Sequence, residues 1–151
     1  MDLEPDAVAQ AVLDGYASDC TRTYGTGGEV DPRDRDVYDL VARAQEAALA
    51  AVRPGPTGRE VDAVAREIID AAGHAEHFGH GLGHGVGMEI HEAPRLASTA
   101  EGALVAGNVV TVEPGVYLPG RGGVRIEDLV VVTEGGRDVL SGTTKDLVSV
   151  D

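Results

Sequence analysis

His-Phe-Gly-His-Gly-Leu-Gly-His-Gly-Val-Gly-Met-Glu-Ile-His-Glu-Ala-Pro, residues 77 to 94, is the most informative stretch of the chain. It contains four histidines (His77, His80, His84 and His91) and five glycines that leave the backbone free to fold around them. Imidazole is the commonest neutral metal ligand in proteins and a proton carrier near neutral pH. The stretch therefore predicts a site that binds a metal, moves protons, or does both.

Three carboxylates elsewhere in the chain stand in unusual local sequences. Asp19 lies in Ser-Asp-Cys-Thr-Arg-Thr, Glu113 in Val-Thr-Val-Glu-Pro-Gly and Glu127 in Gly-Val-Arg-Ile-Glu-Asp. Each is ordinary when taken alone, because such residues often stabilise turns. Together with His84 they would form an oxygen-rich ligand set for a divalent metal, in which a shared carboxylate can bridge two ions. The predicted chemistry is metal-assisted hydrolysis.

Two further histidines are close enough in sequence to reach a substrate in the same pocket. His80 lies four residues before His84, and His91 lies seven residues after it. Both side chains suit the orientation of a substrate and hydrogen bonding to a developing tetrahedral centre.

The composition limits the class of protein and its partners. The chain has 151 residues, enough for one domain with a sizeable core, and a formal net charge of −14, with Lys145 as its single lysine. Such an acidic surface, typical of a salt-adapted protein or a GC-rich genome, argues against nucleic acids and anionic membranes as partners. No apolar run is long enough to span a bilayer. The lone Cys20 excludes an internal disulfide and favours a reducing, cytoplasmic location.

The hydrophobic pattern predicts two helices followed by strands. Asp31-Pro32 is a helix start, and the apolar spacing after it predicts a helix over 32–52. Thr57 with Glu60 forms a capping box for a second helix over 58–72. We expect a β-hairpin from 7–13 and 16–24 around Asp14-Gly15, an exit loop over 25–28, and strands over 88–91, 109–113, 115–118, 123–127 and 129–133. The predicted fold class is α+β, a curved and mostly antiparallel sheet with helices on one face.

Taken together, these sequence blocks resemble the "pita-bread" metallopeptidases, a group that includes Xaa-Pro aminopeptidases and dipeptidases, methionine aminopeptidases and creatinase-type amidinohydrolases. The blocks occur in the family's order and approximate spacing over nearly the whole chain. The resemblance implies that the metal ligands are Asp19, His84, Glu113 and Glu127, and that His80, His91 and Arg125 bind substrate and handle protons.

The ending Ile-His-Glu-Ala-Pro and the Val-Tyr after Glu-Pro-Gly are more similar to Xaa-Pro peptidases than to methionine aminopeptidases. The resemblance thus implies hydrolysis of the peptide bond before proline in a small peptide, by an Xaa-Pro aminopeptidase or dipeptidase. It also implies one or two divalent ions, with Mn²⁺ expected ahead of Co²⁺ or Zn²⁺.

The chain departs from the family pattern in two ways. The family has a further metal-binding aspartate eleven positions before Asp19, where this chain has Val8, and Asp6 lies two residues earlier still. The family domain is also a pseudo-symmetric pair of halves, and residues 1–151 resemble its C-terminal portion. We therefore expect a homo-oligomer or a complementing chain as partner. Two alternatives stay open: a catalytically impaired metal-binding scaffold, and another hydrolase specificity such as methionine aminopeptidase or amidinohydrolase.

Overall fold

Two helices form one layer of the molecule, and both begin where the sequence predicts. The computed structural model describes residues 11–150. Helix α1 (Pro32–Ala51) follows Asp31, whose side chain accepts a hydrogen bond from the backbone N–H of Arg33. Helix α2 (Gly58–Ala71) follows Thr57, which forms the expected capping box. Within the described residues, neither helix nor any other is long and apolar enough to cross a bilayer.

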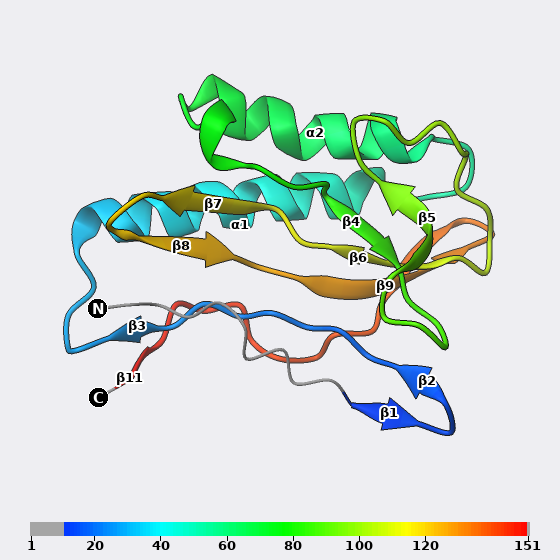
Figure 1. Cartoon of the computed structure of the whole chain (residues 1–151), viewed down its shortest axis with the longest axis horizontal. Coiled ribbons are helices and arrows are strands. Elements are labelled where there is room, and N and C mark those ends of the chain that lie inside the picture. Colours follow the sequence, from blue (N-terminus) through cyan, green and yellow to red (C-terminus); the bar gives the residue numbers. More distant parts are fainter. Residues whose placement is uncertain (1–10, 151) are drawn as a thin grey trace.

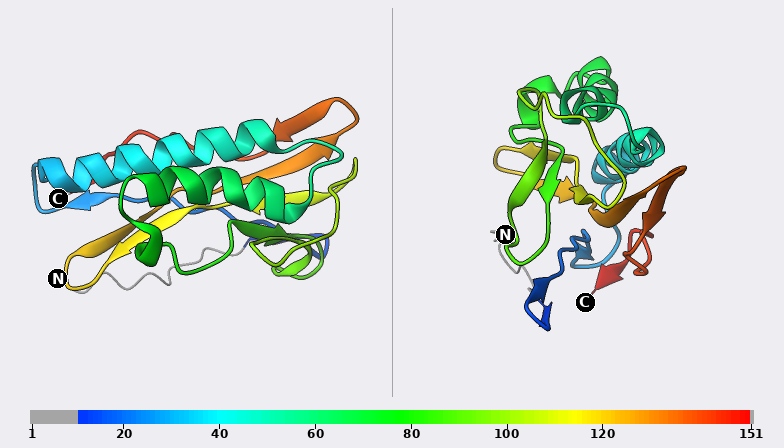
Figure 2. Two further views of the ribbon diagram at one scale, coloured as in Figure 1. Left: turned by 90° about the horizontal axis from the view of Figure 1, so that it is seen from above. Right: turned by 90° about the vertical axis from the view of Figure 1, so that its right-hand side faces the viewer.

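The second layer is an antiparallel five-stranded sheet with the order β10–β9–β6–β4–β5. Its strands are β4 (Gly83–Gly85), β5 (Glu92–Leu96), β6 (Val109–Val112), β9 (Asp128–Thr133) and β10 (Gly136–Val139). After a short break, β6 leads into a hairpin of β7 (Gly115–Leu118) and β8 (Gly122–Arg125), which returns the chain to β9. The paired strands β6 with β9 and β7 with β8 thus form one long two-stranded ribbon. Both helices lie on the same side of this ribbon (Figures 1 and 2).

The remaining elements are short and lie at the periphery. They are β1 (Val12–Leu13), β2 (Tyr16–Ala17), β3 (Gly25–Thr26), the 3₁₀ turn η1 (Ala75–His77) and β11 (Ser149–Val150). The predicted hairpin turn is confirmed, because Asp14 and Gly15 connect β1 to β2 with positive φ angles of 52° and 86°. The hairpin leaves Val12, Leu13 and Tyr16 exposed at one end of the molecule (Figure 1).

The core lies between the helices and the central strands. Small side chains on α1, such as Ala44 and Ala48, are completely buried and allow the helix to pack closely. The sheet contributes a layer of valines, and α2 contributes a stripe with helical spacing. The fully buried members of these two sets are Val61, Ala65, Ile69, Val110, Val112 and Val130. On the side of the ribbon away from the helices run the segments that lead to β3 and β11 (Figure 1).

The expectations of a strand over 88–91 and of an exit loop over 25–28 were wrong. The hairpin expected over 7–13 and 16–24 lies partly outside the described residues, and within them it is paired only at Val12–Leu13 and Tyr16–Ala17. Residues 88–91 form an irregular loop in which Met88 is exposed, and the strand pairing falls on the flanking β4 and β5. Gly25 and Thr26, expected in an exit loop, pair in parallel with β11. The pairing of β3 with β11 joins segments distant in sequence, which local periodicity cannot register, whereas 88–91 connects two strands that pair with each other. The expectations for Val8 and Asp6 fall outside the described residues.

Candidate metal centre

Two of the predicted carboxylates lie where the long ribbon is interrupted. β6 ends at Val112 and β8 ends at Arg125, so Glu113 and Glu127 fall in the gap between the two paired regions. Their backbone N–H groups bond outside the ribbon: that of Glu113 donates to Leu82 O at 2.8 Å and that of Glu127 to Thr21 O at 3.1 Å. At this break the ribbon is therefore hydrogen-bonded to the segments that carry His84 and Asp19.

The glycines around His84 allow β4 to lie between two neighbouring strands. A Cβ at Gly83 would lie 2.0 Å from the carbonyl oxygen of Thr111, and one at Gly85 would lie 2.3 Å from that of Ala93. Larger residues at these two positions would push the strands apart. The Gly-His-Gly sequence therefore allows His84 to lie on an internal strand of the sheet, where its side chain is buried.

The backbone also fixes the tautomer of His84. Its Nδ1 lies 3.1 Å from the carbonyl oxygen of Gly85, and because a carbonyl can only accept, Nδ1 carries the hydrogen. In the neutral ring Nε2 then has its lone pair free. That atom faces two carboxylates, with Glu113 Oε1 at 3.1 Å and Asp19 Oδ2 at 3.7 Å. Donation of the second ring N–H to a backbone carbonyl is the usual arrangement for a metal-binding histidine.

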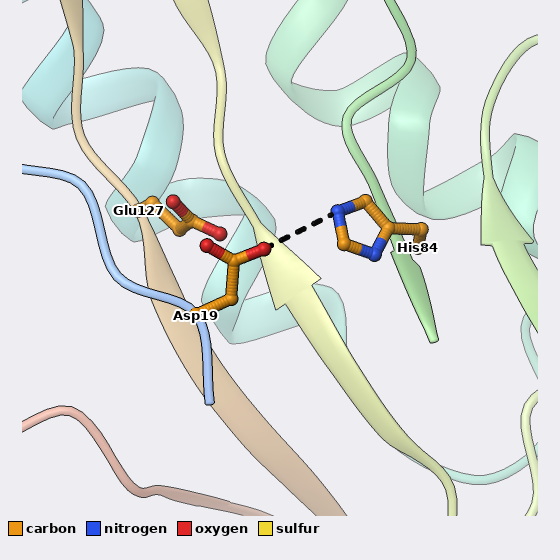
Figure 3. Close-up of side chains that lie close together, drawn as sticks. All are labelled: Asp19, His84 and Glu127. Carbon is orange, nitrogen blue, oxygen red and sulfur yellow. Dashed lines mark ion pairs between the residues drawn. The ribbon is translucent and has the colours of Figure 1, made fainter. Parts of the chain in front are cut away.

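Three of the four predicted ligands come together, and the fourth contacts one of them. One ligand atom each from Asp19, His84 and Glu127 lie within 4.8 Å of one another (Figure 3). Glu113 joins the group through its contact with His84. Two ligands on opposite sides of one ion with bonds of 2.0–2.3 Å would be about 4.0–4.6 Å apart. The cluster is thus close to the dimensions that a single ion requires.

The surroundings of Glu127 disfavour its charged form. It is only 2% exposed, and burial together with the charges of Glu113 and Asp19 raises its pKa to about 7. Thr21 donates a 2.5 Å hydrogen bond to Glu127 Oε2, whereas Oε1 has no hydrogen-bond partner in the described part of the chain. A buried carboxylate oxygen without a donor, beside other carboxylates and an imidazole lone pair, fits a divalent cation as the missing partner.

Hydrogen bonds favour the charged forms of the neighbouring residues Glu113 and His84. Although burial disfavours the charge, the hydrogen bonds from His84 and Thr111 keep the pKa of Glu113 below its usual value. For His84 too burial opposes the charge, but the contacts with Glu113 and the Gly85 carbonyl raise its pKa. The site can therefore hold protons that a cation would displace.

The other predicted site residues surround this cluster at different distances. The ring of His91 stacks against that of His84 at 4.2 Å between centroids, with a tilt of 56°. Arg125 donates to Thr21 Oγ1 at 3.1 Å and so contacts the hydroxyl that bonds Glu127. His80 is linked to the site through Tyr117, whose hydroxyl lies 2.9 Å from His80 Nε2.

Three polar residues of the site were missed in the sequence. Thr21 and Thr23 follow Asp19 at intervals of two, so on an extended segment they share its face, and they bond Glu127 and Arg125 respectively. This alternation was a usable signal. Tyr117 gave no comparable signal, because its contact with His80 depends on the position of the β7–β8 hairpin.

The raised pKa values predict an inverse dependence of stability on pH in metal-free protein. Between about pH 4.5 and 7 folded Glu127 keeps a proton that the unfolded chain has lost, so its contribution to stability is full at the acid end, falls as the pH rises and is gone above about pH 7. A pKa near 7 in place of 4.5 corresponds to about 3 kcal/mol. The raised pKa of His84 acts in the same direction.

Urea unfolding in EDTA at a series of pH values measures this effect. We expect the free energy of unfolding to decrease across this range in the unmodified protein. It should decrease less in Glu127→Gln, because the amide cannot ionise. Equal slopes in the two proteins would show that Glu127 is not the group responsible.

The chain is similar in sequence and in fold to known metallopeptidases. The profile of metallopeptidase family M24 matches residues 8–134. The Xaa-Pro dipeptidase of Pyrococcus furiosus is 46% identical over 138 residues, which cover 91% of this chain and 39% of that protein. The crystal structure of a dipeptidase from Pyrococcus horikoshii superposes with a TM-score of 0.90 at 45% identity, covering 93% of this chain and 39% of the other. An X-Pro aminopeptidase from Thermotoga maritima gives a TM-score of 0.89 at 40% identity, with the same two coverages.

The likeness confirms the expected pita-bread architecture, and the chain spans 39% of the length of the Pyrococcus furiosus relative. The matched region contains all four residues of the cluster and all three residues expected around it. Since the family profile accounts for most of its length, the chain belongs to metallopeptidase family M24.

Proposed function

We propose that this chain carries the divalent-metal centre of a peptidase that hydrolyses the bond before proline. The observation that carries the proposal is the convergence of an imidazole lone pair with buried carboxylates, one of which has an unpartnered oxygen. The names of the similar proteins, an Xaa-Pro dipeptidase and an X-Pro aminopeptidase, support the specificity for proline. A dipeptidase and an aminopeptidase differ in the length of the peptide that they cleave.

In this proposal Asp19, His84, Glu113 and Glu127 hold the ion. The donor set of one nitrogen and several carboxylate oxygens favours Mn²⁺, with Co²⁺ and Zn²⁺ as the other candidates, and a shared carboxylate permits one or two ions. When bound, a divalent ion polarises the peptide carbonyl and lowers the pKa of water. Binding of the ion would displace the proton that Glu127, with its pKa of about 7, holds in the metal-free protein.

The surrounding residues would orient the substrate and move protons. His91 is exposed while its ring lies against His84, so it can meet a substrate that enters the site. His80 donates through Nδ1 to the carbonyl of Gly81 at 2.8 Å, which leaves Nε2 to accept the hydroxyl proton of Tyr117. Arg125 lies beside Tyr117 and the carboxylates and supplies positive charge for substrate binding. A small peptide is the proposed substrate, and a second copy or a complementing chain stays a prediction.

The first test of the proposal is metal binding. His84→Ala and Glu113→Ala should each weaken Mn²⁺ binding by more than about 100-fold, because each removes a direct ligand, whereas residues around a metal site change affinity by roughly 10- to 100-fold. Titration calorimetry of protein freed of metal with EDTA measures the effect. Glu101→Ala is the matched control, since this glutamate is exposed and distant from the cluster. Unchanged Mn²⁺ affinity in His84→Ala would place the ion elsewhere.

The second test is hydrolysis. Protein loaded with Mn²⁺ should cleave an Xaa-Pro dipeptide faster than the matching Xaa-Ala dipeptide, and a tripeptide distinguishes aminopeptidase from dipeptidase action. His80→Ala and His91→Ala should lower kcat by about 10²- to 10⁴-fold, typical of lost proton handling, and weaken Mn²⁺ binding much less than His84→Ala does. His74→Ala, in a histidine pair outside the site, is the control and should keep full activity.

Cleavage that does not depend on proline would argue for another hydrolase specificity. Metal binding without any cleavage would favour the scaffold alternative. In that case Val8→Asp, which restores the family's further aspartate, should raise both the occupancy of a second ion and the activity.

A further inference from the structure

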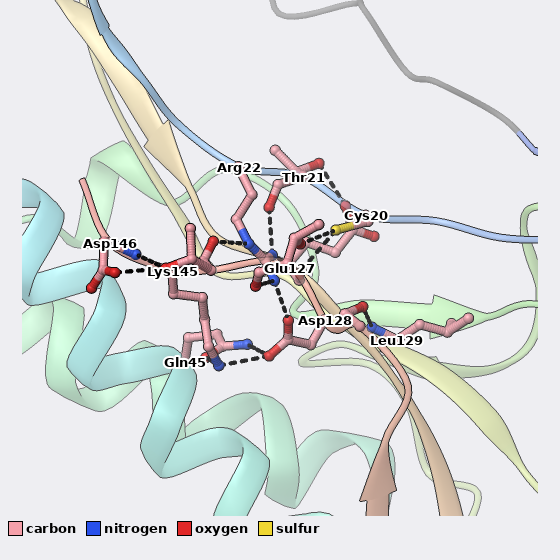
Figure 4. Close-up of polar contacts among 12 residues, drawn as sticks. Cys20, Thr21, Arg22, Gln45, Glu127, Asp128, Leu129, Lys145 and Asp146 are labelled. Carbon is pink, nitrogen blue, oxygen red and sulfur yellow. Dashed lines mark hydrogen bonds and ion pairs between the residues drawn. The ribbon is translucent and has the colours of Figure 1, made fainter. Parts of the chain in front are cut away.

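The guanidinium group of Arg22 is almost completely enclosed, and all five of its N–H donors are used. The side chain is 7% exposed. Its five acceptors are the backbone oxygens of Thr21, Glu127, Thr143 and Thr144 and the Oδ1 of Asp128 (Figure 4). An arginine presents these donors in a rigid planar fork, so such a set of contacts defines the relative positions of the segments that supply them.

Asp128 is the acidic partner and is fully buried. Its Oδ1 accepts from Arg22 at 2.8 Å, and its Oδ2 accepts from Gln45 Nε2 at 2.8 Å and from Lys145 Nζ at 2.7 Å. Through this carboxylate the first residue of β9 is joined to α1 and to the segment 143–146 (Figure 4). The charge is thus both paired and fully hydrogen-bonded, as burial requires.

The two residues of the ion pair lie close in sequence to two of the proposed metal ligands. Arg22 follows Asp19 by three residues, and Asp128 follows Glu127 immediately. Arg22 also donates to the carbonyl oxygen of Glu127, while Glu127 N–H donates to Thr21 O at 3.1 Å. These bonds join the two backbone segments that carry Asp19 and Glu127. Two carboxylates at such short range repel each other when both are charged. Other contacts must therefore hold the segments of Asp19 and Glu127 together before an ion binds.

We propose that the Arg22–Asp128 ion pair is a positioning element that sets the spacing of Asp19 and Glu127 and thereby the affinity of the centre for a divalent ion. The inference rests on the proposed metal centre and adds two residues that do not touch the ion. It differs from a purely structural role, in which loss of the pair would lower stability and leave the affinity of the folded protein unchanged.

Two variants test the proposal by titration calorimetry with Mn²⁺. Arg22→Lys keeps the positive charge and loses the planar fork, so it should fold and bind Mn²⁺ about tenfold more weakly. The double variant Arg22→Met with Asp128→Asn removes both charges together, which avoids an unpaired buried charge, and retains an oxygen acceptor for Gln45 and Lys145. It should bind roughly 10- to 100-fold more weakly. Circular dichroism and thermal unfolding establish that each variant is folded at the temperature of the titration.

Val132→Ala is the matched control, because it removes buried volume from the same strand without touching the ion pair. It should lower the melting temperature and leave Mn²⁺ affinity unchanged. If folded Arg22→Lys or the folded double variant binds Mn²⁺ as tightly as the unmodified protein, the positioning role is wrong. If Val132→Ala weakens binding as much as they do, the effect is one of general stability, and the role is equally wrong. Failure of the unmodified protein to bind Mn²⁺ would instead contradict the metal centre itself.

Discussion

The constraint on which the site depends is the crowding of several carboxylates around one imidazole in a poorly solvated place. Burial of Glu127, together with the charges of Glu113 and Asp19 beside it, raises its pKa to about 7. The arrangement makes physical sense when a cation completes it, since the ion supplies the missing charge and a partner for the free oxygen of Glu127.

The fold delivers these side chains by local departures from regular structure. The ribbon formed by β6 to β9 breaks at Glu113 and Glu127, and at that point their backbone groups bond to the segments of His84 and Asp19. Glycines on both sides of His84 let β4 fit between its neighbours. Both helices cover one face of the sheet (Figure 2), and the apolar core lies between them and the central strands.

The sequence predicted what is encoded locally. Both helix starts were predicted because the caps at Asp31 and Thr57 act within a few residues, and the Asp14-Gly15 turn was predicted for the same reason. The strand expected over 88–91 is not formed, because this segment is the connection between β4 and β5, which pair with each other.

The same distinction holds for the site. The ligand types were readable, since histidine and carboxylate residues in these short blocks point to a metal. The groups that support them were not, because their contacts join distant parts of the chain. Arg22 and Asp128 are 106 residues apart in sequence, and His80 and Tyr117 are 37 apart. No local pattern records such pairs, and only the folded chain shows that they meet.

The most direct measurement of the central claim is X-ray diffraction from crystals of this chain grown with Mn²⁺, recorded at an energy where manganese scatters anomalously. The account predicts an anomalous peak with Asp19, His84, Glu113 and Glu127 all contributing ligand atoms at about 2.0–2.3 Å. A second peak nearby would indicate a second ion sharing these carboxylates. A map without a peak among these four side chains, at a concentration of Mn²⁺ that saturates binding in solution, would contradict the account.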